Sequence, residues 1–206
     1  MQAYMKSSMP FYGIRTTERR AICKQAFAKS PMDSVHEWRS TALAMWREAQ
    51  HREERYAALE LTGYRLYRPF QTMKELPMYE EMILTGAWWD FVDTIAKDRL
   101  GPLLERYPSQ MRRKMLQWSK SPNLWKRRSA ILCQLGFKRN TDLLLLYACI
   151  APSLASKEFF LQKAIGWALR QYAWTNPAEV KRYVRQNAES LSALSKREAL
   201  KNIGSD

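Results

Sequence analysis

Apolar residues recur along most of the chain at the three- and four-residue spacing of an amphipathic helix, and no stretch alternates as a half-buried strand does. Pro, Gly and capping residues interrupt this pattern, which predicts helices of about 10–17 residues joined by short turns. The predicted ranges are 16–29, 34–50, 52–67, 78–85, 88–100, a short piece after 102, 109–120, 122–135, 142–151, 157–174, a helix from 177 and one from 195 to 204. Such a series indicates an all-α fold of consecutive antiparallel helix pairs. No strict sequence period is visible, so the pattern is compatible with a solenoid without establishing one.

Recognisable signals mark several of the helix ends. Ser34 opens an S-x-x-E capping box, and Asn176, which precedes a proline, is a well-formed N-cap. The helix from 52 is predicted to stop before Pro69. Ser195 opens a second S-x-x-E pattern, which predicts the start of the last helix, and Gly204 is expected to end it.

The sequence WWDFVD at the start of the predicted helix 88–100 places an aromatic ring beside a carboxylate. At about 100° per residue, one face of this helix is apolar and is formed by Trp88, Val92, Ile95 and Ala96. Trp89 and Asp93 stand one turn apart on the flank of that face. A core helix with a solvated Asp93 is the alternative interpretation.

Composition favours a packed protein with a polyanionic partner. Hydrophobic residues make up 46% of the chain and glycine occupies only 7 positions, which argues against disorder. With 206 residues, we expect one domain over residues 1–206 with a sizeable core. The formal net charge of +14 favours nucleic acid as partner, ahead of an acidic membrane surface or an acidic protein.

Several classes of chemistry find no support in the sequence. Three widely spaced cysteines without a CxxC motif fit a reducing compartment, and two histidines make a metal site or a Ser-His-Asp triad improbable. We therefore expect no metal and no cofactor. No secretory signal is readable, and the most apolar segment, 143–155, is too short to span a bilayer and contains Pro152. These features predict a soluble, cytoplasmic protein, with a monomer as the default.

Positive charge is concentrated between Arg106 and Thr141, a stretch without Asp or Glu. Its cations are Arg106, Arg112, Arg113, Lys114, Lys120, Lys126, Arg127, Arg128, Lys138 and Arg139. A solvated helix surface usually mixes charges of both signs, so this stretch indicates a phosphate-binding surface. Trp118 and Trp125 lie within it and suit a groove or exposed bases. Either indole also suits the core, which is the preferred interpretation for Trp118.

Arg128 interrupts an apolar arc in the predicted helix 122–135. The arc consists of Leu124, Trp125, Ile131, Leu132 and Leu135. A guanidinium group is rarely left unpaired in a core. Arg128 is therefore expected either to pair with a carboxylate in a buried salt bridge or to point into a cleft that binds an anion.

The predicted helix 157–174 has apolar residues on one face and a mixture of cations and indoles on the other. The inward stripe is Leu161, Ile165, Ala168, Leu169 and Tyr172, and the opposite face carries Lys163, Trp167, Arg170 and Trp174. Two cations beside two indoles suit a nucleic-acid backbone and stacked bases. The alternative is a helix that neighbouring helices bury on both sides.

Five motifs, in their order and spacing, resemble the AlkD-like DNA alkylation-repair glycosylases from Tyr4 to about Tyr183. They are Tyr4-Met5-Lys6, Phe11-Tyr12-Gly13-Ile14-Arg15 with Glu18-Arg19-Arg20, Trp88–Asp93, Leu124-Trp125-Lys126-Arg127-Arg128 and the stretch Phe160–Arg170. Family members usually have more helix before the first motif, whereas three residues precede it here. The resemblance implies HEAT-like helical repeats stacked in a C-shaped solenoid, with duplex DNA in a basic concave channel.

The resemblance also implies hydrolysis of the N-glycosidic bond of cationic alkylpurines, chiefly 3-methyladenine and 7-methylguanine, in double-stranded DNA. Asp93 is then the catalytic carboxylate, with Trp89 and Trp167 beside the lesion. Expected DNA contacts are Arg128 in the cleft, Tyr4 as a further wall, and Lys6, Trp125, Lys126, Arg127, Lys163 and Arg170. Family members are understood to work without extruding the base, unlike most glycosylases.

A non-catalytic helical-repeat protein that binds damaged or branched DNA, or a scaffold for a protein partner, is the competing class. Convergence of Trp89, Asp93, Arg128 and Trp167 on one cleft favours the enzyme, and their dispersal favours the binder. A position of the Asp93 carboxylate on the convex outer surface, or an internal salt bridge that occupies it and closes the cleft, would refute the catalytic role.

Overall fold

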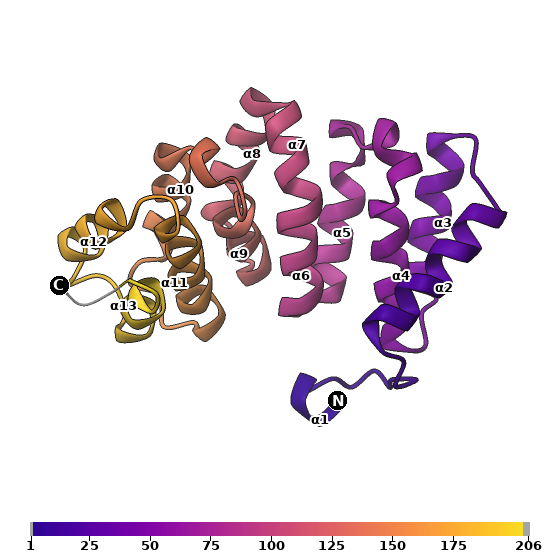
Figure 1. Ribbon diagram of the computed structural model, residues 1–206, viewed down its shortest axis with the longest axis horizontal. Helices are drawn as coiled ribbons and strands as arrows, with labels where there is room; N and C mark the ends of the chain where they lie inside the picture. The colour runs from indigo at the N-terminus through magenta and orange to yellow at the C-terminus, as the bar shows by residue number, and fades with distance from the viewer. Residues whose placement is uncertain (1, 204–206) are drawn as a thin grey trace. The chain divides into compact units, whose positions relative to one another are not determined.

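The computed structural model describes residues 2–203, which contain helices and connecting turns and no strand (Figure 1). The predicted all-α, helical-repeat fold is confirmed. The chain divides into two compact units, Met1–Met82 and Ile83–Asp206. Whether they act as the single domain expected from the sequence stays a prediction. None of the described helices is long and apolar enough to cross a membrane.

The first unit is built around a pair of helices joined by a four-residue turn. The first of these helices, Val35–Arg47, carries Trp38 and Trp46, and the second, Arg52–Gly63, carries Leu61. All three side chains are almost fully buried where the two helices pack together, which accounts for the apolar periodicity of both segments. The elements are α1 (Gln2–Met5), α2 (Thr16–Lys29), α3 (Val35–Arg47), α4 (Arg52–Gly63), the 3-10 helices η1 (Arg65–Phe70) and η2 (Met73–Glu75), and α5 (Leu76–Gly86), which crosses into the second unit.

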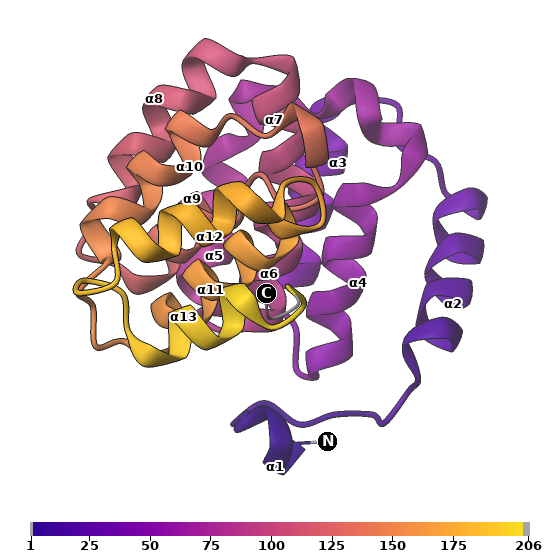
Figure 2. The ribbon, with the colours of Figure 1, turned by 60° about the vertical axis from the view of Figure 1, so that its left-hand side comes forward.

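The second unit has one continuous core around α11. Its elements are α6 (Trp89–Ile95), the π-helix η3 (Ala96–Leu100), α7 (Gly101–Arg106), α8 (Pro108–Ser119), α9 (Leu124–Leu132), η4 (Lys138–Asn140), α10 (Leu143–Ile150), η5 (Ala151–Ser153), α11 (Phe159–Ala173), α12 (Pro177–Gln186) and α13 (Ala193–Leu200). Leu161, Ile165 and Leu169 are fully buried, as the predicted inward stripe requires. The helices α9, α12 and α13 all lie against α11 (Figure 1, Figure 2).

Close packing of α11 against α13 depends on Gly166. A Cβ at this position would lie 3.0 Å from the carbonyl oxygen of Ser195 and would collide with the side chain of Glu198. The absence of a side chain therefore lets the two helix backbones approach, and Glu198 is brought onto the polar face of α11.

Several predicted helix boundaries differ from the structure by two to four residues, among them the ends expected at 50 and 135, which lie at Arg47 and Leu132. The helix from Arg52 ends at Gly63, not at 67, because the next residues turn into the 3-10 helix η1, which includes Pro69. Burial explains the difference: Tyr67 is fully buried, and its ring packs against those of Tyr64 and Phe70. The 3-10 helix thus buries Tyr67 fully and leaves Tyr64 and Phe70 partly buried beside it.

The last helix begins earlier than predicted. Ser192, not Ser195, is the N-cap of α13, and its hydroxyl oxygen accepts a hydrogen bond from the Ser195 backbone N–H at 3.0 Å. The S-x-x-E spacing that suggested a capping box at Ser195 instead belongs to the helix interior, where Glu198 reaches toward α11. The predicted end at Gly204 lies outside the described residues.

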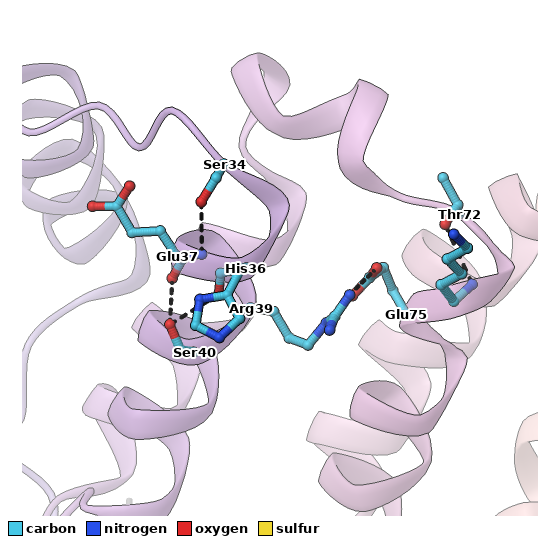
Figure 3. A network of polar contacts seen from close by, with 8 residues as sticks. Ser34, His36, Glu37, Arg39, Ser40, Thr72 and Glu75 are labelled. Atoms are coloured by element: carbon cyan, nitrogen blue, oxygen red, sulfur yellow. Dashed lines mark hydrogen bonds and ion pairs between the residues drawn. The ribbon is translucent and has the colours of Figure 1, made fainter.

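The other strong caps lie where the sequence places them. Ser34 accepts a hydrogen bond from the Glu37 backbone at 3.1 Å (Figure 3), and Asn176 accepts one from Glu179 at 3.0 Å. In the first unit, Arg39 of α3 also forms a bidentate ion pair with Glu75 of η2, with Nη2 2.6 Å from Oε1 (Figure 3). Glu75 is 1% exposed, so this pair neutralises a buried carboxylate.

Replacing Arg39 by alanine is expected to destabilise the protein by about 1–2 kcal/mol, because it leaves the buried Glu75 without its cation. The loss stays below that of a fully buried pair since the Arg39 side chain is 37% exposed and screened by water. Urea unfolding measures it. Arg47→Ala is the matched control, because its bidentate partner Glu81 is itself partly exposed, and a much smaller loss is expected there. Equal losses would contradict the assignment to burial.

Candidate active site

A buried ion pair joins α6 to α9. The two carboxylate oxygens of Asp93 accept hydrogen bonds from Nε and Nη2 of Arg128, each at 2.7 Å. Asn123 caps α9 by accepting hydrogen bonds from the first backbone N–H groups of the helix, which fixes where Arg128 emerges. Of the two alternatives left open for Arg128, the structure shows the salt bridge, and its partner is the candidate catalytic carboxylate.

A third helix holds the guanidinium in place. Nη1 of Arg128 donates to the backbone carbonyl of Phe160 in the first turn of α11, and the guanidinium carbon lies 5.8 Å from the centre of the Phe160 ring. Both terminal nitrogens and Nε of Arg128 are thus engaged by protein atoms. Arg128, on α9, is consequently held by contacts to α6 and α11, and its expected role as a DNA contact stays a prediction.

Burial dominates the electrostatics of the pair. The side chains of Arg128 and Asp93 are 5% and 12% exposed. Burial raises the pKa of Asp93 above its ordinary value, the hydrogen bonds and charge of Arg128 oppose that rise, and the nearby Asp90 adds to it. The bidentate geometry is that of an ionised carboxylate facing a guanidinium.

The salt bridge does not use all of the carboxylate. An ionised carboxylate offers about four lone-pair positions, and a bidentate arginine occupies two of them. Asp93 also keeps 12% of its side-chain surface exposed. Whether the salt bridge leaves an oxygen of Asp93 open to water or to a cation, or closes the cleft around it, stays a prediction.

Aromatic rings pack beside this pair. Trp88, the N-cap of α6, lies 5.3 Å from the Phe160 ring and 6.2 Å from that of Trp125, and the latter two rings are 5.1 Å apart. Trp125 is 7% and Trp118 1% exposed, so both indoles take the core alternative. Trp88 is partly buried, and its Nε1–H has no hydrogen-bond partner within the described residues.

The two indoles expected beside the lesion are partly buried on elements of the site. Trp89 lies one turn before Asp93 on α6. Trp167 lies two turns after Phe160 on the same face of α11, about 10 Å along the helix axis. The structure therefore brings Asp93 and Phe160 together through their contacts with Arg128, and the convergence of Trp89 and Trp167 on Asp93 stays a prediction.

The cations of α11 are paired within the protein. Glu198 of α13 accepts hydrogen bonds from Lys163 at 2.9 Å and from Arg170 at 2.7 Å. These cations, Lys163 foremost, lower the pKa of Glu198. The polar face of α11 is thus covered by α13 near Gly166, as in the alternative of a helix buried on both sides, while Trp174 at its end is 71% exposed.

The remaining expected DNA contacts lie in different surroundings. Arg127 of α9 donates to the Ser153 hydroxyl oxygen at 2.9 Å, and the Lys126 ammonium lies 5.6 Å from the Trp118 ring centre. Tyr4, which is 81% exposed, and Lys6 belong to the first unit. Their predicted roles at DNA stay predictions.

Sequence reasoning missed two residues that shape the site. In the sequence Phe160 stands out only as part of a motif, although its carbonyl and ring hold Arg128. Glu198 fits a local capping box there, although its partners are Lys163 and Arg170 of α11. The S-x-x-E spacing allowed that interpretation. The signal that could have been used is that the helix of Lys163 and Arg170 contains no acidic residue to pair with them. Their counter-charge therefore had to come from elsewhere in the chain.

Within residues 2–203, no group of three or more His, Cys, Asp or Glu side chains is placed to hold a metal ion. The three cysteines are free and buried. Burial raises the pKa of the Cys149 thiol to about 12, so this cysteine is not a nucleophile at neutral pH.

Comparisons with known proteins agree with the fold and with the motifs. A family model described as DNA alkylation repair enzyme matches residues 1–203. A solved structure described as "Predicted DNA alkylation repair enzyme from Enterococcus faecalis" is 31% identical, has a TM-score of 0.89, and is covered over 94% of its length by 100% of this chain. No curated protein matches the chain. Because the family match spans nearly the whole sequence, the chain belongs to the DNA alkylation repair enzyme family.

Proposed function

We propose that this protein is a DNA glycosylase that hydrolyses the N-glycosidic bond of cationic alkylated purines, chiefly 3-methyladenine and 7-methylguanine, in duplex DNA. Family membership supports a role in alkylation repair. The observation that carries the proposed reaction is the carboxylate of Asp93, held in one orientation by Arg128 and still partly exposed.

Hydrolysis of the N-glycosidic bond of a cationic purine requires few catalytic groups besides a carboxylate. Alkylation at N3 or N7 gives the purine a positive charge, so the base is a good leaving group without a general acid. The barrier lies in forming an oxocarbenium-like sugar, as in glycoside hydrolysis. A preorganised anion stabilises that cation and holds the attacking water, and Asp93 has free lone pairs for both tasks.

Arg128 is proposed as a positioning residue for Asp93. Its contacts to Asp93 and to the Phe160 carbonyl engage Nε and both terminal nitrogens, and only 5% of its side chain is exposed, which leaves little access for a phosphate. The indole faces of Trp89 and Trp167 are proposed to favour the cationic sugar and base through their quadrupoles.

Base release from methylated duplex DNA, resolved by chromatography, tests the proposed function. Wild-type protein is expected to release 3-methyladenine and 7-methylguanine and to leave abasic sites, and the Asp93→Asn variant is not. Tight binding to alkylated DNA without release by the folded wild-type protein would reject the glycosylase and favour the non-catalytic DNA-binding protein.

Removing the charge of Glu198 is expected to strengthen binding to duplex DNA. Glu198 neutralises Lys163 and Arg170, so Glu198→Gln frees two cations for phosphates. We expect an affinity gain of about threefold to tenfold at low salt and, if both cations reach phosphates, a plot of log affinity against log salt that is steeper by about two units. Fluorescence anisotropy with a labelled duplex measures both.

Glu189→Gln controls for the change in net charge, because Glu189 is exposed and lies outside this cluster. If Glu198→Gln and Glu189→Gln gain the same DNA affinity, the gain comes from the change in net charge and not from the release of Lys163 and Arg170. Weaker binding by Glu198→Gln alone would show that Glu198 positions the two cations for DNA rather than competing with it.

A further inference from the structure

Two adjoining hollows lie at the far end of α11 from Asp93. One has a volume of about 390 Å³, and its apolar lining includes Ile131 of α9, Leu135 of the turn after α9, and Leu146 of α10. The other has a volume of about 540 Å³ and a polar lining that includes Arg139 and Asn140. Gly136, Lys138, Trp174 and Thr175 line both hollows, so an apolar and a polar compartment share one wall.

Trp174 is the conspicuous part of that shared wall. Its side chain is 71% exposed, whereas a large aromatic residue is usually covered. It follows Phe160 by about four helical turns, or about 21 Å along α11. The indole therefore offers an open stacking face at a distance from the contacts of Asp93.

Two cationic side chains line the polar hollow together with Trp174. Lys138 and Arg139 are exposed neighbours in η4, and neither forms an ion pair within residues 2–203. Glu105 also lines the polar hollow. Two cations against one carboxylate leave the lining with a net positive charge, which favours an anionic group beside Lys138 and Arg139.

We propose that these hollows form a second nucleic-acid site, which binds a nucleotide whose base is not paired or stacked. The base lies against Trp174 over the apolar compartment, and the phosphate lies against Lys138 and Arg139 in the polar one. An apolar and a cationic compartment on either side of one indole match the two halves of a nucleotide. The nucleotide comes either from a single strand or from free solution.

Binding of a labelled single-stranded octadeoxynucleotide, followed by fluorescence anisotropy, tests the site. Trp174→Ala is expected to weaken binding about tenfold, as for other base-stacking aromatic residues. Because the Trp174 side chain is largely exposed, its removal is not expected to impair folding. Lys138→Gln is expected to lower the salt dependence of the affinity by about 0.7 in the log–log slope. The controls are Leu144→Ala, which removes a 75% exposed apolar side chain outside both hollows, and Lys157→Gln.

Competition identifies the source of the nucleotide. If deoxyadenosine monophosphate displaces the oligonucleotide from the wild-type protein but does not bind the Trp174→Ala variant, the site also accepts free nucleotides. Binding that depends on Trp174 but resists the monophosphate assigns it to a strand. The proposal is overturned if Trp174→Ala binds like wild type, if inorganic phosphate competes as well as the nucleotide, or if relaxed closed-circular duplex binding is weakened equally. Release of alkylated bases, measured separately, reports on the proposed catalytic function alone.

Discussion

Asp93→Asn is expected to lower the rate of 7-methylguanine release from methylated duplex DNA by about a thousandfold, since it removes the charge that faces the developing sugar cation. The substitution keeps the shape of the side chain and leaves one oxygen to accept a hydrogen bond from Arg128. Single-turnover release with protein in excess measures the chemical step without product dissociation. DNA binding by the variant is expected to change little, because one buried and neutralised carboxylate adds little to the external field.

Loss of folding is the competing explanation, and two variants separate it from loss of chemistry. Asp98→Asn removes an exposed carboxylate five residues further along the chain, 3.8 Å from the Lys97 ammonium. Normal release of 7-methylguanine is expected from this variant. The double variant Asp93→Asn/Arg128→Met has no buried charge at this place and is expected to fold but to remain inactive. Normal release by folded Asp93→Asn would reject the catalytic role.

The sequence predicts the helices well because each carries its own local signals. Ser34 and Asn176 cap their helices with hydrogen bonds that depend only on neighbouring residues. The errors at Gly63 and Ser192 arise where tertiary packing decides, through the buried Tyr67 and through the approach of α13 to Gly166. Helix periodicity contains no information about either contact.

The candidate site was predictable in part. An arginine inside an apolar arc requires a counter-charge, and that requirement singled out Arg128 before any partner was known. Which carboxylate supplies it depends on how α6 packs on α9, because Asp93 is 35 residues away in sequence. The same limit applies to Glu198 and the two cations of α11, and to the Phe160 carbonyl, which no side-chain pattern reveals.

Arg128→Met is expected to destabilise the protein by about 3 kcal/mol at neutral pH, because it leaves the Asp93 carboxylate buried and unpaired. The loss is also expected to depend on pH. With Arg128 gone, the influences left on Asp93 are burial and Asp90, which both raise its pKa, so the folded-state pKa rises further above that of the unfolded chain. Ionisation of a group with a raised folded-state pKa favours unfolding, so the destabilisation grows as pH rises through that pKa.

Urea unfolding of Arg128→Met and wild type at about pH 5 and about pH 8 measures this, with the larger difference between the two proteins expected at the higher pH. Adding Asp93→Asn to Arg128→Met removes the buried charge and is expected to recover most of the lost stability at pH 8 and to abolish the pH dependence of the difference. A deficit that is the same at both pH values, or that persists in the double variant, would locate the loss in packing around the Arg128 stem. In that case the Phe160 ring and carbonyl, rather than Asp93, would be the principal partners that hold α9 against α11.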